Sequence, residues 1–392
     1  MKLQRKIVFL FAALAGIVIL PYLGTVARFG GKLPPNFFYY PPIHKPDVAP
    51  FNEIVFGISI AICLFVALVY IMPGWFGFKK NTPPVEAPVE KVKFPIWFWL
   101  GLVLWGVPVI LLWSKATQPI TLLHYSDLPL FWGFTFLLDG LVYKRSGGRS
   151  IIADNPREMI GIGSASVSGW MIFEFLNFFI GMNWYYPHGG DIDSEKFLLY
   201  ALIGSSGLLP MAFEWYDLLL TFKPLKHRFD TGVKVNLSLW VKALLIVAAF
   251  VTLYFMGRNP AAFFSFIWIS PLIILSIVLG LLGVWTPFRP LKQGNWSPFL
   301  LFALAYLLQG LAMEGWNYFS GTHNAAGELI MTQSPAYWVY NIPYVYKYRI
   351  FEMPLVGYVG YLPFSVWCWI WWIMYAYLQG IPTRFYDDTE IV

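Results

Sequence analysis

The sequence predicts an all-α fold, a polytopic membrane helical bundle of about ten transmembrane helices with two parallel three-helix repeats. Three observations support this class. Only 12% of the 392 residues are charged and 58% are hydrophobic, whereas soluble domains carry about 25% charged residues. Ten apolar stretches approach the roughly 20 residues that a helix needs to cross a bilayer. Several short phrases also occur twice in the same order, which indicates an internal duplication.

The apolar stretches give the order of the predicted helices. They lie at 7–27, 51–75, 96–114, 127–143, 159–181, 197–221, 238–256, 262–286, 297–315 and 355–379. The stretch at 262–286 has the weakest helical pattern, because Pro260 precedes it and Pro271 interrupts it. The first stretch also fits a secretory signal, with Thr25 and Ala27 at a cleavage site. We favour an uncleaved membrane anchor.

The distribution of basic residues predicts the orientation, because Lys and Arg collect in cytoplasmic loops. With the N-terminus inside, 19 of the 27 Lys and Arg residues fall in cytoplasmic segments. The prediction is a multi-pass protein of the cell (inner) membrane with both termini in the cytoplasm. The net charge of +6 follows from this topology and gives no reason to expect nucleic acid as a partner.

Three landmarks of the duplication recur in one order. The first copy has E-F-L-N-F-F-I-G (Glu174 to Gly181), W-Y-Y-P (Trp184 to Pro187) and G-S-S-G-L-L-P (Gly204 to Pro210); the second has E-G-W-N-Y-F-S-G (Glu314 to Gly321), W-V-Y (Trp338 to Tyr340) and G-Y-V-G-Y-L-P (Gly357 to Pro363). Equivalent helices stand four positions apart in the order of the ten helices, and an even offset preserves direction across the membrane. The units are therefore predicted to be parallel repeats, related by an axis near the membrane normal.

The duplication divides the chain into five regions. They are an N-terminal membrane region at 1–95 that includes a Pro-rich cytoplasmic linker, a third helix and outer loop at 96–126, repeat unit 1 at 127–237, a linking helix at 238–261, and repeat unit 2 at 262–392 with an outer-loop insertion at 322–352 and a short cytoplasmic tail. The insertion is rich in tyrosine, which suits either a lid over an outer-facing cavity or a docking surface.

Equivalent acids stand at equivalent depth in the two units. Glu174 and Glu314 fall near the outer ends of outward-running helices, and Asn177 and Asn317 follow one turn later on the same face. A glutamate that faces lipid costs on the order of 3 kcal/mol, so both are expected to face the bundle or a wet cavity. Two interpretations stay open. Each Glu–Asn pair is a structural pin between neighbouring segments, or it binds a ligand or acts in catalysis.

Other polar residues form two groups by depth. Glu352 and Asp127 lie at the outer face, whereas Asp139, Glu214 and Asp217 lie deeper, toward the cytoplasm. The deeper acids are either interfacial side chains or a second polar station within the bundle. The two cysteines lie in predicted membrane segments and the five histidines lack ligand spacing, so no metal site is predicted and no cofactor is indicated.

Aromatic residues make up 20% of the chain, and Trp367 to Tyr377 is the densest run. Such side chains suit the wall of a cavity for a long unsaturated or isoprenoid ligand, and they equally suit packing between helices. If there is a cavity, the candidate ligand-binding residues are Asn177, Asn317, Asp127, Trp184, Trp338 and Tyr340.

Two pairs of phrases carry a resemblance to a known family. W-Y-Y-P precedes L-L-P-M-A-F-E (Leu208 to Glu214), and W-V-Y-N-I-P (Trp338 to Pro343) precedes F-E-M-P (Phe351 to Pro354). In these residues the two units resemble the lycopene cyclase domain family, in its small membrane-embedded form, over about half the chain. The family's Pro-x-Glu-Glu arrangement is absent. The resemblance implies a scaffold of tandem three-helix repeats and chemistry like that of carotenoid biosynthesis, in which a membrane acid protonates a polyene. The candidate acids here are Glu174, Glu314 and Glu352.

Three functions are compatible with these features. The first is binding or modification of a lipid or isoprenoid, polyene-like or quinone-like, in an aromatic cavity between the repeats. The alternative is a non-catalytic subunit or assembly factor that docks other membrane or periplasmic subunits through its outer loops. The third is a transporter. Whether the protein is an enzyme stays open.

Overall fold

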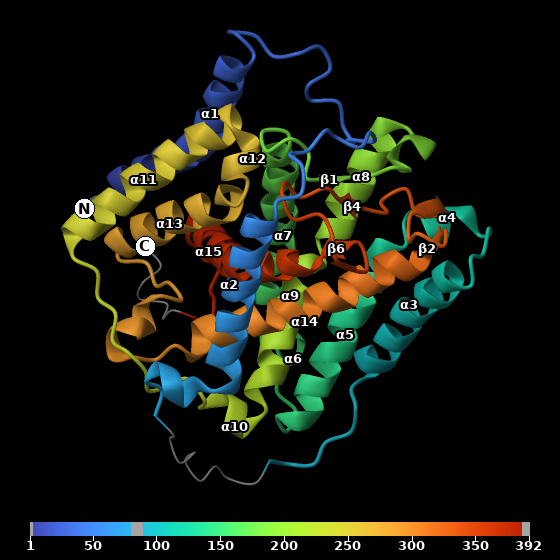
Figure 1. The fold of residues 1–392 in the computed structure, drawn as a ribbon. Helices are drawn as coiled ribbons and strands as arrows, with labels where there is room; N and C mark the ends of the chain where they lie inside the picture. The colour runs from blue at the N-terminus through green and yellow to red at the C-terminus, as the bar shows by residue number, and fades with distance from the viewer. Residues whose placement is uncertain (1–2, 80–88, 386–392) are drawn as a thin grey trace.

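The computed structural model describes residues 3–79 and 89–385, and this part of the chain is mostly helical (Figure 1). Seven helical segments in it are long and apolar enough to cross a membrane. The predicted class, a multi-pass helical membrane protein, is confirmed at this level. Most of the predicted Pro-rich linker and of the C-terminal tail lies outside the described residues.

The seven segments are distributed along the whole chain. They are α1 (Leu3–Arg28), α2 (Glu53–Ile71), α3 (Ile96–Trp113), α7 (Pro156–Asn177), α8 and α9 together (Ser194–Ser205 and Leu208–Leu220), α11 (Leu239–Arg258) and α14 (Ser297–Ser320). Three further helices lie in the remaining predicted segments, namely α5 (Asp127–Arg145), α13 (Phe266–Leu281) and α15 (Tyr361–Gln379). Charged residues interrupt the apolar character of α5, α13 has only 16 residues, and Trp and Tyr lower the hydropathy of α15.

The last helix of each unit differs from the continuous segments predicted at 197–221 and 355–379. In the first unit the helix breaks before α9, which begins at Leu208. In the second, a 3-10 helix, η4 (Leu355–Gly360), leads into α15 at Tyr361. Both breaks fall in the Gly-x-x-Gly phrase, since glycine weakens a helix interior. A hydropathy pattern does not detect them because the flanking residues are apolar.

Two helix ends next to the predicted acids also differ from the prediction. α7 ends at Asn177, before the predicted end at 181, because the chain turns through Gly181, which has a φ of 82°. α14 continues beyond 315 to Ser320. Glu174 therefore lies in the last turn of its helix, and Glu314 lies further inside its own.

Glycines allow two helix pairs to approach closely. A Cβ on Gly24 of α1 would lie 1.9 Å from the Tyr254 carbonyl oxygen of α11, and one on Gly257 would lie 2.0 Å from the Pro21 carbonyl oxygen. Between α3 and α5, a Cβ on Gly133 would lie 2.4 Å from the Trp105 nitrogen. Small residues at such contacts let backbones pack directly in a membrane, where no hydrophobic effect drives helices together.

The centre of the bundle is α15, which packs against α7, α13 and α14 (Figure 1). Its side chains Trp367, Trp369 and Trp372 are fully buried. The densest aromatic run of the sequence is therefore packed core, and only the first turn of this helix, with Tyr361 and Phe364, reaches the cavity described below.

Short antiparallel strand pairs form in the loops that follow α7 and α14, and one of them joins the two loops. β1 (Trp184–Tyr185) pairs with β4 (Val339–Tyr340), with Trp184 opposite Tyr340. At the two ends of the predicted insertion, β2 (Gly321–His323) pairs with β3 (Leu329–Thr332), and β5 (Arg349–Ile350) pairs with β6 (Met353–Pro354). The β1–β4 pair thus brings the Trp-x-Tyr phrases of the two units side by side.

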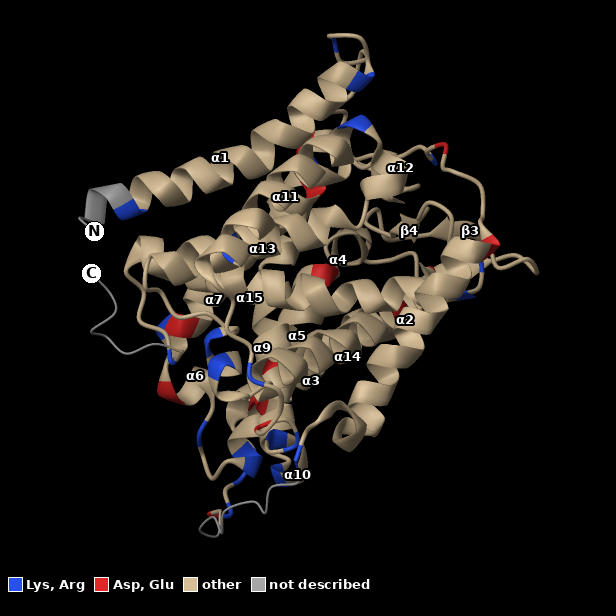
Figure 2. Ribbon diagram, turned by 60° about the vertical axis from the view of Figure 1, so that its left-hand side comes forward, with Lys and Arg blue, Asp and Glu red and all other residues tan. Residues whose placement is uncertain are grey.

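Basic residues are concentrated at one end of the bundle. Figure 2 shows Lys and Arg gathered around α6 (Ile151–Asp154) and α10 (Lys223–Lys226), at the lower end of the view. The loops that carry β1 and β4 lie away from this end (Figure 1). The molecule therefore has a basic end and, opposite it, an end formed by the strand-bearing loops.

Candidate functional site

Glu314 is fully buried in α14 and binds three aromatic side chains through one carboxylate oxygen. Its Oε1 accepts hydrogen bonds from Tyr361 Oη at 2.8 Å, Tyr340 Oη at 2.9 Å and Trp338 Nε1 at 3.3 Å. One turn later, Asn317 Nδ2 donates to the Trp338 carbonyl oxygen at 2.8 Å, and its Oδ1 accepts from the Trp338 backbone nitrogen at 3.1 Å. The Glu–Asn pair thus fixes both the side chain and the backbone of Trp338.

Glu174 makes an equivalent set of contacts at the end of α7. Its Oε1 accepts hydrogen bonds from Tyr186 Oη at 2.5 Å and Trp184 Nε1 at 3.2 Å. Asn177 Nδ2 donates to the Trp184 carbonyl oxygen at 2.8 Å. Each glutamate therefore binds a tryptophan and the tyrosine two positions later, and each asparagine binds the carbonyl of that tryptophan. The two sets differ in Tyr361, because the matching position of the first Gly-x-x-Gly phrase is Leu208.

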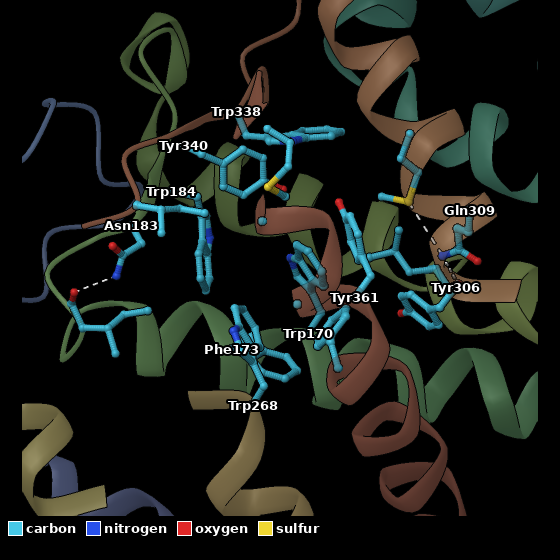
Figure 3. A pocket seen from close by; sticks show the side chains of 18 of the residues that line it. Trp170, Phe173, Asn183, Trp184, Trp268, Tyr306, Gln309, Trp338, Tyr340 and Tyr361 are labelled. Carbon is cyan, nitrogen blue, oxygen red and sulfur yellow. Dashed lines mark hydrogen bonds between the residues drawn. The ribbon is translucent and has the colours of Figure 1, made fainter. Parts of the chain in front are cut away.

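A cavity of about 400 Å³ lies between the two sets. Most of its wall is aromatic or aliphatic, and side chains from α7, α13, α14 and the two loops point toward one space in Figure 3. Its aromatic residues include Trp170, Phe173, Trp184, Trp268, Trp338 and Tyr340. The rings of Trp184 and Trp268 stack with centroids 5.9 Å apart, so side chains from the two predicted units form one continuous wall.

The two carboxylates lie behind this wall. Glu174 and Glu314 are not among the residues that line the cavity, whereas their hydrogen-bond donors Trp184, Tyr186, Trp338, Tyr340 and Tyr361 are. The other carboxylate oxygen of each glutamate is buried and has no hydrogen-bond partner among the described residues. The direct effect of both acids is to position aromatic side chains.

The tyrosines of the loops keep their protons. Burial, followed by the nearby Glu174 carboxyl, raises the pKa of Tyr186 well above its usual value. Burial and the Glu314 carboxyl do the same to the pKa of Tyr340. Both phenols therefore stay neutral at physiological pH and act as hydrogen-bond donors to the glutamates.

Asp127 faces the cavity directly, at the start of α5. Among the described residues that line the cavity it is the only one with a charged side chain. A Cβ on Gly204 of α8 would lie 3.4 Å from the Asp127 Cβ, so these two segments touch. Tyr200, also on α8, lines the same part of the wall and has only 4% of its surface exposed. Its hydroxyl interacts with the Asp127 carboxyl but makes no hydrogen bond of normal geometry within the described part of the chain.

Glu352 belongs to a separate cluster in the outer loop. Its Oε1 accepts a hydrogen bond from Tyr337 Oη at 2.6 Å and lies 3.4 Å from His323 Nε2, and its Oε2 lies 3.3 Å from Arg349 Nη1. Burial and the Glu352 carboxylate raise the pKa of Tyr337. Glu352 does not line the cavity. It connects β2, β5 and the segment between them.

The deeper acids form a buried cluster toward the basic end. Asp139 Oδ1 accepts from Trp97 Nε1 at 2.7 Å, and Asp217 Oδ2 accepts from Arg384 Nη1 at 2.5 Å. Glu214 is fully buried beside Asp139, and neither of its carboxylate oxygens makes a hydrogen bond of normal geometry within the described residues. All three acids are buried inside the bundle. None of these acids lines the cavity.

Sequence reasoning missed three residues of the site. Tyr186 had a signal, because it stands in W-Y-Y-P where the second unit has Tyr340 in W-V-Y. Tyr361 and Tyr200 had none, because their roles depend on contacts between helices. Within 3–79 and 89–385, no group of three or more His, Cys, Asp or Glu residues could hold a metal ion.

The fold and the site define a helical membrane protein with an aromatic cavity between two matched Glu–Asn–Trp–Tyr sets. Comparison of the chain with protein-family models, with curated proteins and with solved structures gave no match. The function is therefore argued from the site itself.

Proposed function

We propose that the protein binds a lipid or isoprenoid ligand, polyene-like or quinone-like, in the cavity between two repeat units. The observation that carries the proposal is the cavity of about 400 Å³ with its wall of aromatic side chains. Ligand sites of this kind are concave, largely apolar and of about 300–1,000 Å³. Flat, rigid rings such as those of Trp184 and Trp268 suit an extended unsaturated chain, because they offer large contact areas at low entropic cost.

The position of the cavity supports entry from the membrane. Its lining includes Ser59 and Ile62 of α2, and the Ile62 side chain is 49% exposed. α2 itself is long and apolar enough to span a bilayer and has no buried residue. The cavity therefore reaches the surface beside a helix whose apolar side chains suit contact with lipid. A ligand dissolved in the bilayer would meet this opening first.

The matched contacts support the finer features of the fold that we also propose: ten membrane segments, with two parallel repeats around the cavity. The Glu–Trp–Tyr hydrogen bonds recur in both units, and both last helices break at the same phrase. The antiparallel pairing of Trp184 with Tyr340 is the arrangement that an approximate two-fold axis between the units would produce.

The charge distribution supports an inner-membrane protein with a cytoplasmic basic end. Lys and Arg gather around α6 and α10 (Figure 2), as expected for the cytoplasmic side. Arg384 contacts Asp217 at this end, and Thr383 donates to Glu158 at 2.6 Å near the start of α7. The segment after α15 therefore reaches the same side.

Under this proposal, Glu174 and Glu314, with Asn177 and Asn317, hold the cavity wall in place. A catalytic step of the kind implied by the lycopene cyclase resemblance would also need an acid at the ligand. Catalysis by Glu174, Glu314 or Glu352 stays a prediction, tested by turnover in the corresponding Gln variants.

The proposal is tested by filling the cavity. Ala201 on α8 lines the cavity, whereas Leu198 on the same helix is 43% exposed. Gently purified protein is analysed by native mass spectrometry, and the released molecules by solvent extraction, absorption spectroscopy and lipid analysis. We expect a stoichiometric polyene, quinone or isoprenoid with wild type and with Leu198→Phe, and its loss with Ala201→Phe. Retention in Ala201→Phe, or release of ordinary phospholipid alone, would contradict the proposal.

A further inference from the structure

We propose that Asp127 and Tyr200 receive the polar headgroup of the ligand, and that this headgroup is a hydrogen-bond donor, a hydroxyl or an amine, and carries no phosphate. This inference rests on the proposed function, because it assigns one part of the same cavity. It concerns which membrane molecules the cavity accepts.

The polar groups are unevenly distributed over the wall. Asp127 on α5 and Tyr200, Gly204 and Ser205 on α8 line one part of it together. The part formed by α13, η4 and α15 is apolar, with Ile269, Val356 and Phe364 among its side chains. An amphipathic ligand would orient with its chain among the aromatic and aliphatic groups and its polar end at α5 and α8.

Several lining atoms lack the partner that buried polar atoms normally have. The Tyr200 hydroxyl is buried beside the Asp127 carboxyl, with which it interacts electrostatically, and it makes no hydrogen bond of normal geometry to any described residue. Asn183 Oδ1 and Gln309 Oε1, in the wall around the same cavity (Figure 3), are buried without partners as well. The cavity thus presents a carboxylate, two amide oxygens and a phenol. Most of these groups are hydrogen-bond acceptors, so a ligand with hydrogen-bond donors would supply the partners that they lack.

The charge of the wall limits the headgroup further. None of the ion pairs in the described part of the chain includes Asp127. The lining also contains no Lys, Arg or His among the described residues. A phosphate next to Asp127 would meet a like charge without a compensating cation, and such an arrangement is strongly unfavourable at low dielectric. A hydroxyl or a protonated amine meets no such barrier.

The test compares three probes with one tail and different heads: a C20 isoprenoid alcohol, the corresponding amine and the corresponding monophosphate. Binding to the purified full-length protein in nanodiscs is measured by native mass spectrometry and by thermal shift. We expect the alcohol or the amine to bind wild type at least about tenfold more tightly than the phosphate, the ratio typical of one charged hydrogen bond. The ratio of the amine affinity to the alcohol affinity shows which of the two donors the site prefers.

Two variants and a control test the assignment of residues. Asp127→Asn should weaken the amine most and remove the discrimination against the phosphate, and Tyr200→Phe should weaken the alcohol about fivefold. Tyr125→Phe is the control, because Tyr125 contacts the Tyr200 ring at 5.9 Å between centroids but does not line the cavity. It should leave all three affinities unchanged.

The outcomes separate the two proposals. Equal binding of phosphate and alcohol by wild type would overturn the headgroup inference, as would unchanged alcohol and amine binding in both variants. If Ala201→Phe still abolishes binding in that case, the cavity remains a ligand site. If no probe binds wild type and no ligand co-purifies with it, both proposals fail.

Discussion

The two Glu–Asn–Trp–Tyr sets hold the same kind of wall, but their surroundings differ. In the second unit, Tyr361 adds a third hydrogen bond to Glu314, and Asn317 binds Trp338 through both of its polar atoms. In the first, Glu174 has two such donors, and Asn177 Oδ1 has no hydrogen-bond partner among the residues that the structure describes. The second set is therefore the more fully bonded of the two.

The first unit contributes the one charged side chain among the described residues that line the cavity. Asp127 lines the cavity there, whereas α13, in the corresponding place in the second unit, contributes Ser265, Trp268 and Ile269. The second unit instead has the Glu352 cluster, which fastens its outer loop away from the cavity. Residues that match between the two predicted units form much of the wall, and residues that differ between them give the cavity a polar part and an apolar part.

The largest expected difference between the sets concerns their glutamates. Glu314→Ala removes the acceptor of three hydrogen bonds and Glu174→Ala the acceptor of two. At roughly 1 kcal/mol for each bond, we expect the free energy of unfolding to fall by about 3 and about 2 kcal/mol, respectively. Reversible unfolding in detergent measures both. A larger loss for Glu174→Ala would contradict the proposed asymmetry.

The two asparagines allow the same comparison between the sets, with a smaller expected loss of stability. Asn317→Ala removes two hydrogen bonds to Trp338, and Asn177→Ala removes one to Trp184. We expect losses of about 2 and about 1 kcal/mol in the free energy of unfolding. Tryptophan fluorescence during unfolding follows the change near these side chains. Equal losses would mean that the backbone contact of Asn317 Oδ1 contributes little.

The sequence indicated the members of the two Glu–Asn–Trp–Tyr sets, except Tyr186, but not their geometry. The equivalence of Glu174 with Glu314 and of Trp184 with Trp338 could be predicted, because the landmarks recur in one linear order. The position of the carboxylates behind the cavity wall could not be predicted, because it depends on how the loops fold back over the helix ends. The Tyr361–Glu314 bond joins residues 47 positions apart and follows from the packing of α15 on α14.

For the helices too, one part of the structure could be predicted from the sequence and another part could not. Hydropathy located the apolar segments, since a bilayer imposes a minimum length. It missed the breaks at Leu208 and Tyr361, where both flanks are equally apolar. The sequence also placed Glu352 at the outer face without distinguishing a cavity residue from a loop contact, and the hydrogen bond from Tyr337 is what assigns Glu352 to the loop.

The smallest expected effect concerns Tyr361, which has no counterpart in the first set. Tyr361→Phe removes one hydrogen bond to Glu314 and keeps the ring in the cavity wall, so we expect a loss of about 1 kcal/mol in the free energy of unfolding. In a Glu314→Ala background the same change should cost almost nothing, because the partner is gone, and a double-mutant cycle measures this coupling. Leu208→Tyr is the converse change. If it raises stability, the first unit can accept the same third bond, and the asymmetry depends on this one position. If it lowers stability, the surrounding packing of α9 has also diverged, and the difference between the units extends beyond the hydrogen bonds.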